Sequence, residues 1–340
     1  MEMEMQMMIE LAVVMVLASF TMAMVMIPAL IEKLKKRGIV AIDYYKKDLR
    51  KIPTRGGVVI LAVVFLMFGV ATLFEHLPVS VPISVPIHVS EVDWAILIVA
   101  GLFGAFGLVD DFVDVGRPMK IFMLFFFSYR LIFEIRSTMV TIPLIGSFDF
   151  GAFYLFLIIP IYVLVAANLV NMHSGFNGLA SGLSVIVLAF MLVKFIMAGC
   201  DGVFMLCCML GATSGFLWYN RYPARIFLGN VGSLSLGAAI GAAIVVSGFL
   251  VSGFVMLIPH TINFLMYVYW RLMHWRHPGD KRWRIEKFGK VRDDGTLEVP
   301  NHLTLKWVLP YHCRMTEKQA VLAMYALTIP FCVAALFIPY

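Results

Sequence analysis

The segment from Gly107 to Asp114 places three carboxylates within five residues, at Asp110, Asp111 and Asp114. On a helix, Asp110 and Asp114 share one face because they are four residues apart. Carboxylates this close repel each other unless a cation lies among them, and hard oxygen ligands suit Mg²⁺ held together with substrate phosphates. The segment therefore indicates a magnesium–phosphate site, and the alternative is a solvated helix end. Lys120 would contact a phosphate oxygen or extend to the membrane surface.

A second polar cluster runs from Asn168 to Gly182 and combines amides with repeated glycines. Asn168 and Asn171 are three residues apart, so on a helix they lie on the same side. Amides line an anionic pocket without adding charge, and glycine lets the backbone approach a ligand closely. The pair Asn177-Gly178 alone would be typical of a turn, but the whole cluster indicates a ligand-binding segment.

A third cluster, residues 220–233, leads into an apolar run and contains Arg225, Phe227, Gly229 and Asn230. Free backbone N–H groups at a helix start, together with the helix dipole, favour phosphate. The alternative is a glycine-rich turn at the membrane interface.

A fourth cluster opens a long polar loop, residues 271–318, with basic residues among aromatic ones. Such a stretch can bind anionic lipid headgroups, a diphosphate or nucleic acid, and contact with the membrane surface is the simplest alternative. Its basic residues are Arg271, His274, Arg276, His277, Lys281, Arg282 and Arg284.

The elements that carry these clusters are apolar runs long enough to cross a bilayer. Of 340 residues, 61% are hydrophobic and only 14% are charged, which excludes an ordinary soluble enzyme. Because backbone groups must be satisfied in lipid and the runs lack the alternation of barrel strands, we predict an all-α polytopic membrane protein that forms a single domain over residues 1–340. About ten spans are expected, at 9–30, 57–74, 92–109, 119–137, 150–168, 180–198, 203–219, 232–249, 252–270 and 319–338.

Charge orients these spans. Four alternate loops, 31–56, 110–120, 220–231 and 271–318, hold 24 of the 27 Lys and Arg residues. Basic loops stay on the cytoplasmic side, so all four polar clusters are expected on the cytoplasmic face of the cell membrane, with both termini outside. The 271–318 loop then connects the last two helices. A transporter would more often carry its polar residues near mid-membrane.

The order of these clusters resembles the polyprenyl-phosphate N-acetylhexosamine-1-phosphate transferase family, and most closely its dolichyl-phosphate type from eukaryotes and archaea. The resemblance covers residues 40–325 in unbroken order. It is carried by Lys47-Asp48-Leu49, Ile52 to Gly57, Asp110-Asp111 with Asp114 and Lys120, Asn168 to Gly182, Tyr222-Pro223 with Arg225, Phe227 and Gly229, Asn263-Phe264-Leu265, and Asn301 to Leu305.

The resemblance implies roles for individual residues. Asp110, Asp111 and Lys120 would be catalytic, Asp111 and Asn171 would bind Mg²⁺, with Mn²⁺ as an alternative, and Asn177 would lie by the uridine. Asn230 stands where the family usually has a second Asp ligand, so one negative charge is missing there. Further substrate-binding residues would be Lys47, Asp48, Asp114, Asn168, Gly178, Arg225, Phe227, Gly229, Asn263, Arg276, His277 and Arg282.

The implied reaction is transfer of GlcNAc-1-phosphate from UDP-N-acetylglucosamine to dolichyl or another polyprenyl phosphate, with release of UMP. This reaction is the first step in assembling the lipid precursor of N-glycans. The expected partners are these two substrates and membrane lipids, not nucleic acid, and self-association into a homodimer is left open. Two alternatives stay open: a bacterial-type undecaprenyl-phosphate transferase for another surface polymer, and an anion transporter.

Overall fold

The computed structural model describes residues 2–76, 89–113 and 115–339 and is an all-α polytopic membrane protein. Within that part of the chain, eight helical stretches are long and apolar enough to cross a bilayer. They are α1 (Glu2–Lys36), α2 (Gly57–His76), α3 (Glu91–Val113), the continuous stretch of α5 (Gly151–Phe153), the π-helical η2 (Tyr154–Ile158) and α6 (Ile159–Met172), then α7 (Leu179–Ala198), α8 (Val203–Asn220), α9 (Gly229–Ser247) and α13 (Glu317–Leu336).

Two of the ten predicted spans are not single helices. The segment predicted at 252–270 consists of α10 (Leu250–Met256) and α11 (Ile258–Arg276), which are bent by 66° at Leu257. The segment predicted at 119–137 consists of α4 (Arg117–Phe127) and the 3₁₀ helix η1 (Ser128–Glu134). The change occurs at Ser128, whose hydroxyl donates to the carbonyl of Leu124 at 3.1 Å, a bond that competes with regular helix geometry.

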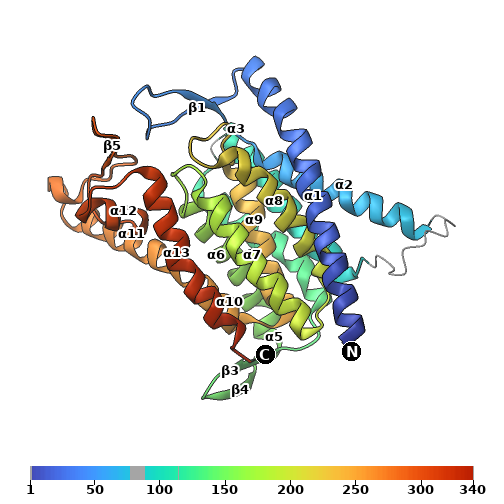
Figure 1. Ribbon diagram of the computed structural model, residues 1–340. Helices are drawn as coiled ribbons and strands as arrows, with labels where there is room; N and C mark the ends of the chain where they lie inside the picture. Colours follow the sequence, from blue (N-terminus) through green and yellow to red (C-terminus); the bar gives the residue numbers. More distant parts are fainter. Residues whose placement is uncertain (1, 77–88, 114, 340) are drawn as a thin grey trace.

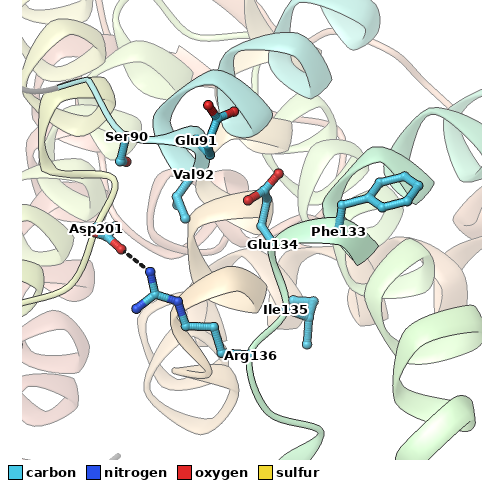
Figure 2. Close-up of a pocket in the computed structure, with 8 residues that line it drawn as sticks. All are labelled: Ser90, Glu91, Val92, Phe133, Glu134, Ile135, Arg136 and Asp201. Carbon is cyan, nitrogen blue, oxygen red and sulfur yellow. Dashed lines mark hydrogen bonds and ion pairs between the residues drawn. The ribbon is translucent and has the colours of Figure 1, made fainter.

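The α4–η1 segment nevertheless runs the length of the bundle. At one end Lys120 pairs with Asp110, near the end of α3. At the other end Arg136 pairs with Asp201, in the connection between α7 and α8, beside Ser90 and Glu91 at the beginning of α3 (Figure 2). Successive membrane-spanning segments thus run between the two ends of the bundle in alternate directions, as predicted from the positions of the basic loops.

The two ends of the bundle differ in what they carry (Figure 1). The N- and C-termini lie at the same end, which is also the end of the antiparallel hairpin β3 (Met139–Ile142) and β4 (Gly146–Asp149). The opposite end carries the hairpin of β1 (Val40–Ile42) and β2 (Lys51–Pro53), and the small elements that follow α11. These elements are η3 (Lys281–Trp283), β5 (Lys290–Val291), β6 (Leu297–Glu298) and α12 (Leu305–His312).

The predicted loop 271–318 is therefore partly helical and folded. Its first residues continue α11 to Arg276. Its later residues form a second, smaller hydrophobic core with the beginnings of α7 and α13, around Tyr45, Phe176, Trp270 and Trp307.

The centre of the bundle is α9, which is buried from Val231 to Val245 and packs against α3, α6 and α2. Small residues let the backbones touch. A Cβ on Gly57 would lie 2.2 Å from the Cα of Gly232, and a Cβ on Gly107 would lie 2.6 Å from the carbonyl oxygen of Asn230. This contact holds the end of α3 directly against the beginning of α9.

Candidate active site

The last turns of α3 bring Asp110 into a compact polar group. One carboxylate oxygen of Asp110 accepts hydrogen bonds from Lys120 Nζ at 2.9 Å and Asn230 Nδ2 at 3.0 Å, and the other accepts from the backbone of Val115 at 3.1 Å. Both oxygens of Asp110 are thus engaged by the protein itself. Asp110 therefore fixes the positions of Lys120 and Asn230.

Asp111 contacts the backbone at the N-terminus of α9, whereas Asp110 contacts the Asn230 side chain. The Asp111 oxygens accept from the backbone N–H of Asn230 at 3.2 and 3.1 Å, as a carboxylate at a helix start should. Arg55 donates to the Asp111 carbonyl and stacks on Phe112, 3.8 Å from the ring centroid. Gly229 has a φ of +73°, and a Cβ there would lie 2.9 Å from an Asp111 oxygen. Only glycine fits this close approach without strain.

Asp111 lines a cavity of about 500 Å³, which we call the Asp111 cavity. Its wall includes Asn171, Ser233 and Asn230, and Ser233 Oγ donates to Asn171 Oδ1 at 2.9 Å. Other lining residues come from separate loops, namely Asp43, Tyr44, Tyr45, Asn177, Phe227, Gly229 and Phe288. Tyr44 and Phe288 stack with their centroids 4.0 Å apart. Three polar clusters of the sequence therefore meet here, together with Tyr44, Tyr45 and Phe288, which had not been predicted as site residues.

A second, larger cavity of about 760 Å³ lies between α4, α6, α11 and α12, and we call it the Lys306 cavity. Its polar groups are the cations Lys120, Arg271, Lys287 and Lys306, the carboxylate of Glu286, and the amides of Asn168 and Asn263. Its apolar wall is formed by Ile121, Leu164, Val165, Phe264, Trp270 and Trp307. Asn171 lines both cavities. The two cavities thus share a boundary at Asn171, close to the carboxylates.

Asn177 lines the Asp111 cavity, but its amide already has partners. Its Nδ2 donates to Asp43 at 3.2 Å, and its Oδ1 accepts from the backbone of Ala224 at 2.8 Å. Its backbone N–H donates to Glu317 at 2.6 Å, and Glu317 in turn pairs with Lys46 at 2.6 Å. Asn177 therefore ties four chain segments together through its backbone and its side chain.

Several residues that the family resemblance suggested as substrate-binding line neither of these two cavities. Lys47 donates to the backbone of Asp293 at 2.6 Å, and Asp48 pairs with Arg50, which lowers the pKa of Asp48. Neither side chain lines the Asp111 cavity or the Lys306 cavity, and the same holds for Arg225, Gly178, Arg276, His277 and Arg282. Arg282 pairs with Asp280, and Arg225 stacks on Tyr219. Asp114 lies outside the described residues.

The helix α11 explains part of this difference. Because it continues to Arg276, it carries Arg276 and His277 to its exposed end, and Arg271 and Lys287 line the Lys306 cavity instead. Asn263 does reach this cavity, but its amide oxygen accepts from the backbone of Leu305 at 3.0 Å. Its side chain therefore anchors α12.

The donors around the Asp111 cavity are suited to a hard cation. No three His, Cys, Asp or Glu side chains of the described residues gather as a metal site. The Asp111 cavity instead offers the Asp111 carboxylate with the amides of Asn171 and Asn230, while its other carboxylate, Asp43, pairs with Lys46. The Asn230 amide oxygen accepts no hydrogen bond from the described residues. Carboxylate and amide oxygens fit Mg²⁺ that completes its shell with substrate phosphate and water.

The opposite end of the bundle also has a cavity, of about 280 Å³ (Figure 2). Its polar groups are Ser90, Glu91, Glu134 and the Arg136–Asp201 ion pair. The clusters predicted from the sequence contribute nothing to its lining. We therefore place the candidate active site at the end that carries Asp110 and Asp111.

Comparison with known proteins identifies relatives of this chain. Residues 94–248 match the glycosyl transferase family 4 model, which covers the end of α3 and the beginning of α9. A Saccharolobus solfataricus protein, provisionally named UDP-N-acetylglucosamine–dolichyl-phosphate N-acetylglucosaminephosphotransferase, is 30% identical over 95% of both chains. A Sulfolobus acidocaldarius protein with the same provisional name is 29% identical over 94% of both chains.

A third relative has a different name. The phospho-N-acetylmuramoyl-pentapeptide-transferase of Thermodesulfovibrio yellowstonii is 32% identical over 68% of this chain and 71% of its own. Because the similarity extends over nearly the whole chain and includes the segments that build the site, this protein belongs to glycosyl transferase family 4.

Proposed function

We propose that this membrane protein transfers GlcNAc-1-phosphate from UDP-N-acetylglucosamine to dolichyl or another polyprenyl phosphate, with release of UMP. The observation that carries the proposal is the pair of cavities that share Asn171. One is bordered by a carboxylate, amides and a helix start, which suit a nucleotide diphosphate. The other combines an apolar wall with cations, which suits a lipid phosphate. The names of the relatives support the same substrates.

Mg²⁺, or Mn²⁺ in its place, would be held by Asp111, Asn171 and Asn230. When bound, it would neutralise charge on the diphosphate and on the departing UMP. The protein's own part is to orient the phosphates. Gly229 lets the beginning of α9 approach Asp111 closely, and the Asn230 N–H fixes the Asp111 carboxylate at the cavity wall.

Asp110 would act through Lys120. Both Asp110 oxygens accept hydrogen bonds, and the pair with Lys120 directs a cation to the wall of the Lys306 cavity. A phosphomonoester is mostly dianionic at neutral pH, since its second pKa is near 6. The acceptor phosphate therefore needs positioning more than it needs a base. In-line attack of its oxygen on the β-phosphorus forms the new P–O bond as the bond to UMP breaks.

The basic loops support a cytoplasmic position for this end of the bundle, where the charged nucleotide is dissolved. The lipid acceptor would enter sideways from the bilayer between α4, α6 and α11. The product would then be a lipid-linked diphosphate sugar at the inner surface, the first intermediate of an N-glycan precursor.

A direct experiment is to incubate purified protein and Mg²⁺ with dolichyl phosphate or undecaprenyl phosphate and a panel of UDP-sugars, including UDP-MurNAc-pentapeptide. We expect UMP and a GlcNAc diphosphate lipid, identified by mass. Lipid product from UDP-MurNAc-pentapeptide alone would contradict the proposed substrate. UDP-GlcNAc flux into sealed vesicles without UMP release would contradict the reaction.

A further inference from the structure

Lys306 occupies the boundary between the two cavities. It lines the Lys306 cavity, and its Nζ donates to the carbonyl of Ser174, a residue of the Asp111 cavity wall. A Cβ on Gly175 would lie 2.5 Å from the Lys306 Nζ. The half-buried ammonium is therefore next to the loop that follows Asn171.

The position of Lys306 is fixed by its surroundings. Asn263 connects the beginning of α12 to the end of α6. Its amide oxygen accepts from the backbone N–H of Leu305, and its Nδ2 donates to the carbonyl of Met172 at 3.5 Å. Trp307 is buried against Trp270 and donates from Nε1 to the Tyr45 hydroxyl at 3.2 Å. The first turn of α12 is thus held against the end of α6, with Lys306 between them.

Lys306 has no ion-pair partner of its own among the described residues, and Glu317, the carboxylate that acts on it from a distance, is paired with Lys46. No carboxylate of the described residues lies within 4 Å of its ammonium, which contacts a carbonyl and the rings of Phe176 and Trp307 at 5.5 and 5.8 Å. Lys120, on the same cavity wall, is paired with Asp110. An unpaired cation in a partly desolvated site is costly unless an anion binds there.

We propose that Lys306 binds a phosphate group of the reacting substrates at the boundary between the two cavities. This inference rests on the proposed function and adds a substrate-binding residue to it. The phosphate has two sources, the β-phosphate of the nucleotide sugar and the phosphate of the lipid acceptor. UMP has no β-phosphate, and neither UMP nor UDP-GlcNAc carries the phosphate of the lipid acceptor.

The test measures binding of UDP-GlcNAc, UMP and farnesyl phosphate by calorimetry to the detergent-purified protein with Mg²⁺. The variants are Lys306→Met and Lys306→Arg, and the matched control is Lys35→Met, which removes an exposed cation near the end of α1. We expect Lys306→Met to weaken binding of UDP-GlcNAc, farnesyl phosphate or both by about tenfold to one-hundredfold, as loss of a charged hydrogen bond does. UMP binding should stay within twofold, Lys306→Arg should retain most of the affinity, and Lys35→Met should match the parent.

The ligand whose binding is weakened identifies the phosphate that Lys306 contacts. Weakening of UDP-GlcNAc alone assigns Lys306 to the β-phosphate, and weakening of farnesyl phosphate alone assigns it to the acceptor. If the parent binds both but Lys306→Met binds all three ligands like the parent, or loses UMP as much as the others, the inference is wrong and the proposed function stands. If the parent binds neither substrate, the proposed function is wrong and the inference with it.

Discussion

Lys46 and Lys306 are two shielded lysines at the same end of the bundle, and their surroundings are opposite. Lys46 is 7% exposed and lies within 3.2 Å of Asp43 and 2.6 Å of Glu317. Lys306 contacts a carbonyl and two aromatic rings. A lysine that is neutralised by the protein has no charge left for a ligand, whereas an unpaired one attracts an anion. The difference assigns Lys46 to architecture and Lys306 to substrate.

The Lys46 cluster joins segments that are far apart in sequence. Glu317 begins α13, Asn177 precedes α7, and Asp43 follows β1. Tyr45, whose pKa is raised to about 12 by burial, adds contacts to Trp307 and Gly289. The wall of the Asp111 cavity therefore depends on the buried charges of Asp43, Lys46 and Glu317.

The largest effect should follow from Lys46→Met. It would leave Asp43 and Glu317 buried without their cation, which typically costs about 3–5 kcal/mol. We expect a large loss of thermal stability in detergent, with or without substrate. The exposed pair Lys36–Glu32 provides the control, since Lys36→Met should leave stability nearly unchanged. Equal melting temperatures for Lys46→Met and the parent would remove the architectural role.

The next effect concerns Lys306→Met. We expect turnover at limiting substrate to fall about tenfold to one-hundredfold while thermal stability is unchanged or higher, because an unpaired cation has been removed. Lys46→Met should thus lower thermal stability, whereas Lys306→Met should lower activity without lowering stability. A stability loss as large as that of Lys46→Met would mean that Lys306 is also architectural.

A smaller effect is expected from Asn230→Asp, beside the third lysine of this end, Lys120. Lys120 pairs with one carboxylate, that of Asp110. Asn230 donates to the same Asp110 oxygen as Lys120. Asn230→Asp replaces this donor by a second negative oxygen, so a divalent cation should be bound more readily. We expect the Mg²⁺ concentration for half activity to fall severalfold. An unchanged or raised requirement would exclude Asn230 as a ligand.

The smallest effect is a shift in pH dependence. Burial lowers the pKa of Lys306 to about 8, while Glu317 acts in the opposite sense. The nearby His173 is uncharged, because burial places its pKa well below its usual value. The Lys306 cation is therefore present below pH 8 and lost above it, and activity should decline as pH rises through 8. Lys306→Arg keeps its charge, so its alkaline decline should begin at higher pH. Coinciding pH profiles for parent and variant would refute the assignment.

Much of the fold followed from local sequence. Apolar length and loop charge predicted where the chain crosses, and the split near Gly248 is present between α9 and α10. The 3₁₀ turn at Ser128 and the bend at Leu257 were not predicted, because apolar length does not register a side-chain bond to the helix backbone, as at Ser128, or a proline just after a bend, as at Pro259. For the site, the sequence predicted that Asp110, Asp111, Asn171 and Asn230 share one site, and they do lie at one end of the bundle.

Other parts of the site had no local signal. Lys46 and Glu317 are 271 residues apart, and Lys306 reaches Ser174 across 132 residues. Only the folded chain shows that the Asn177 amide is occupied by Asp43 and Ala224. For Lys306, an available hint was its place directly after the Asn301–Leu305 stretch that carries the family resemblance.

The glycine contacts between α2, α3 and α9 also limit how the enzyme can move. With no side chain between the backbones at Gly57, Gly107 and Gly232, these helices cannot slide past one another without collision. We therefore expect the carboxylates and Asn230 to keep their spacing when substrate binds. Any closure around a substrate then falls to the peripheral loops, where Tyr44 and Phe288 meet.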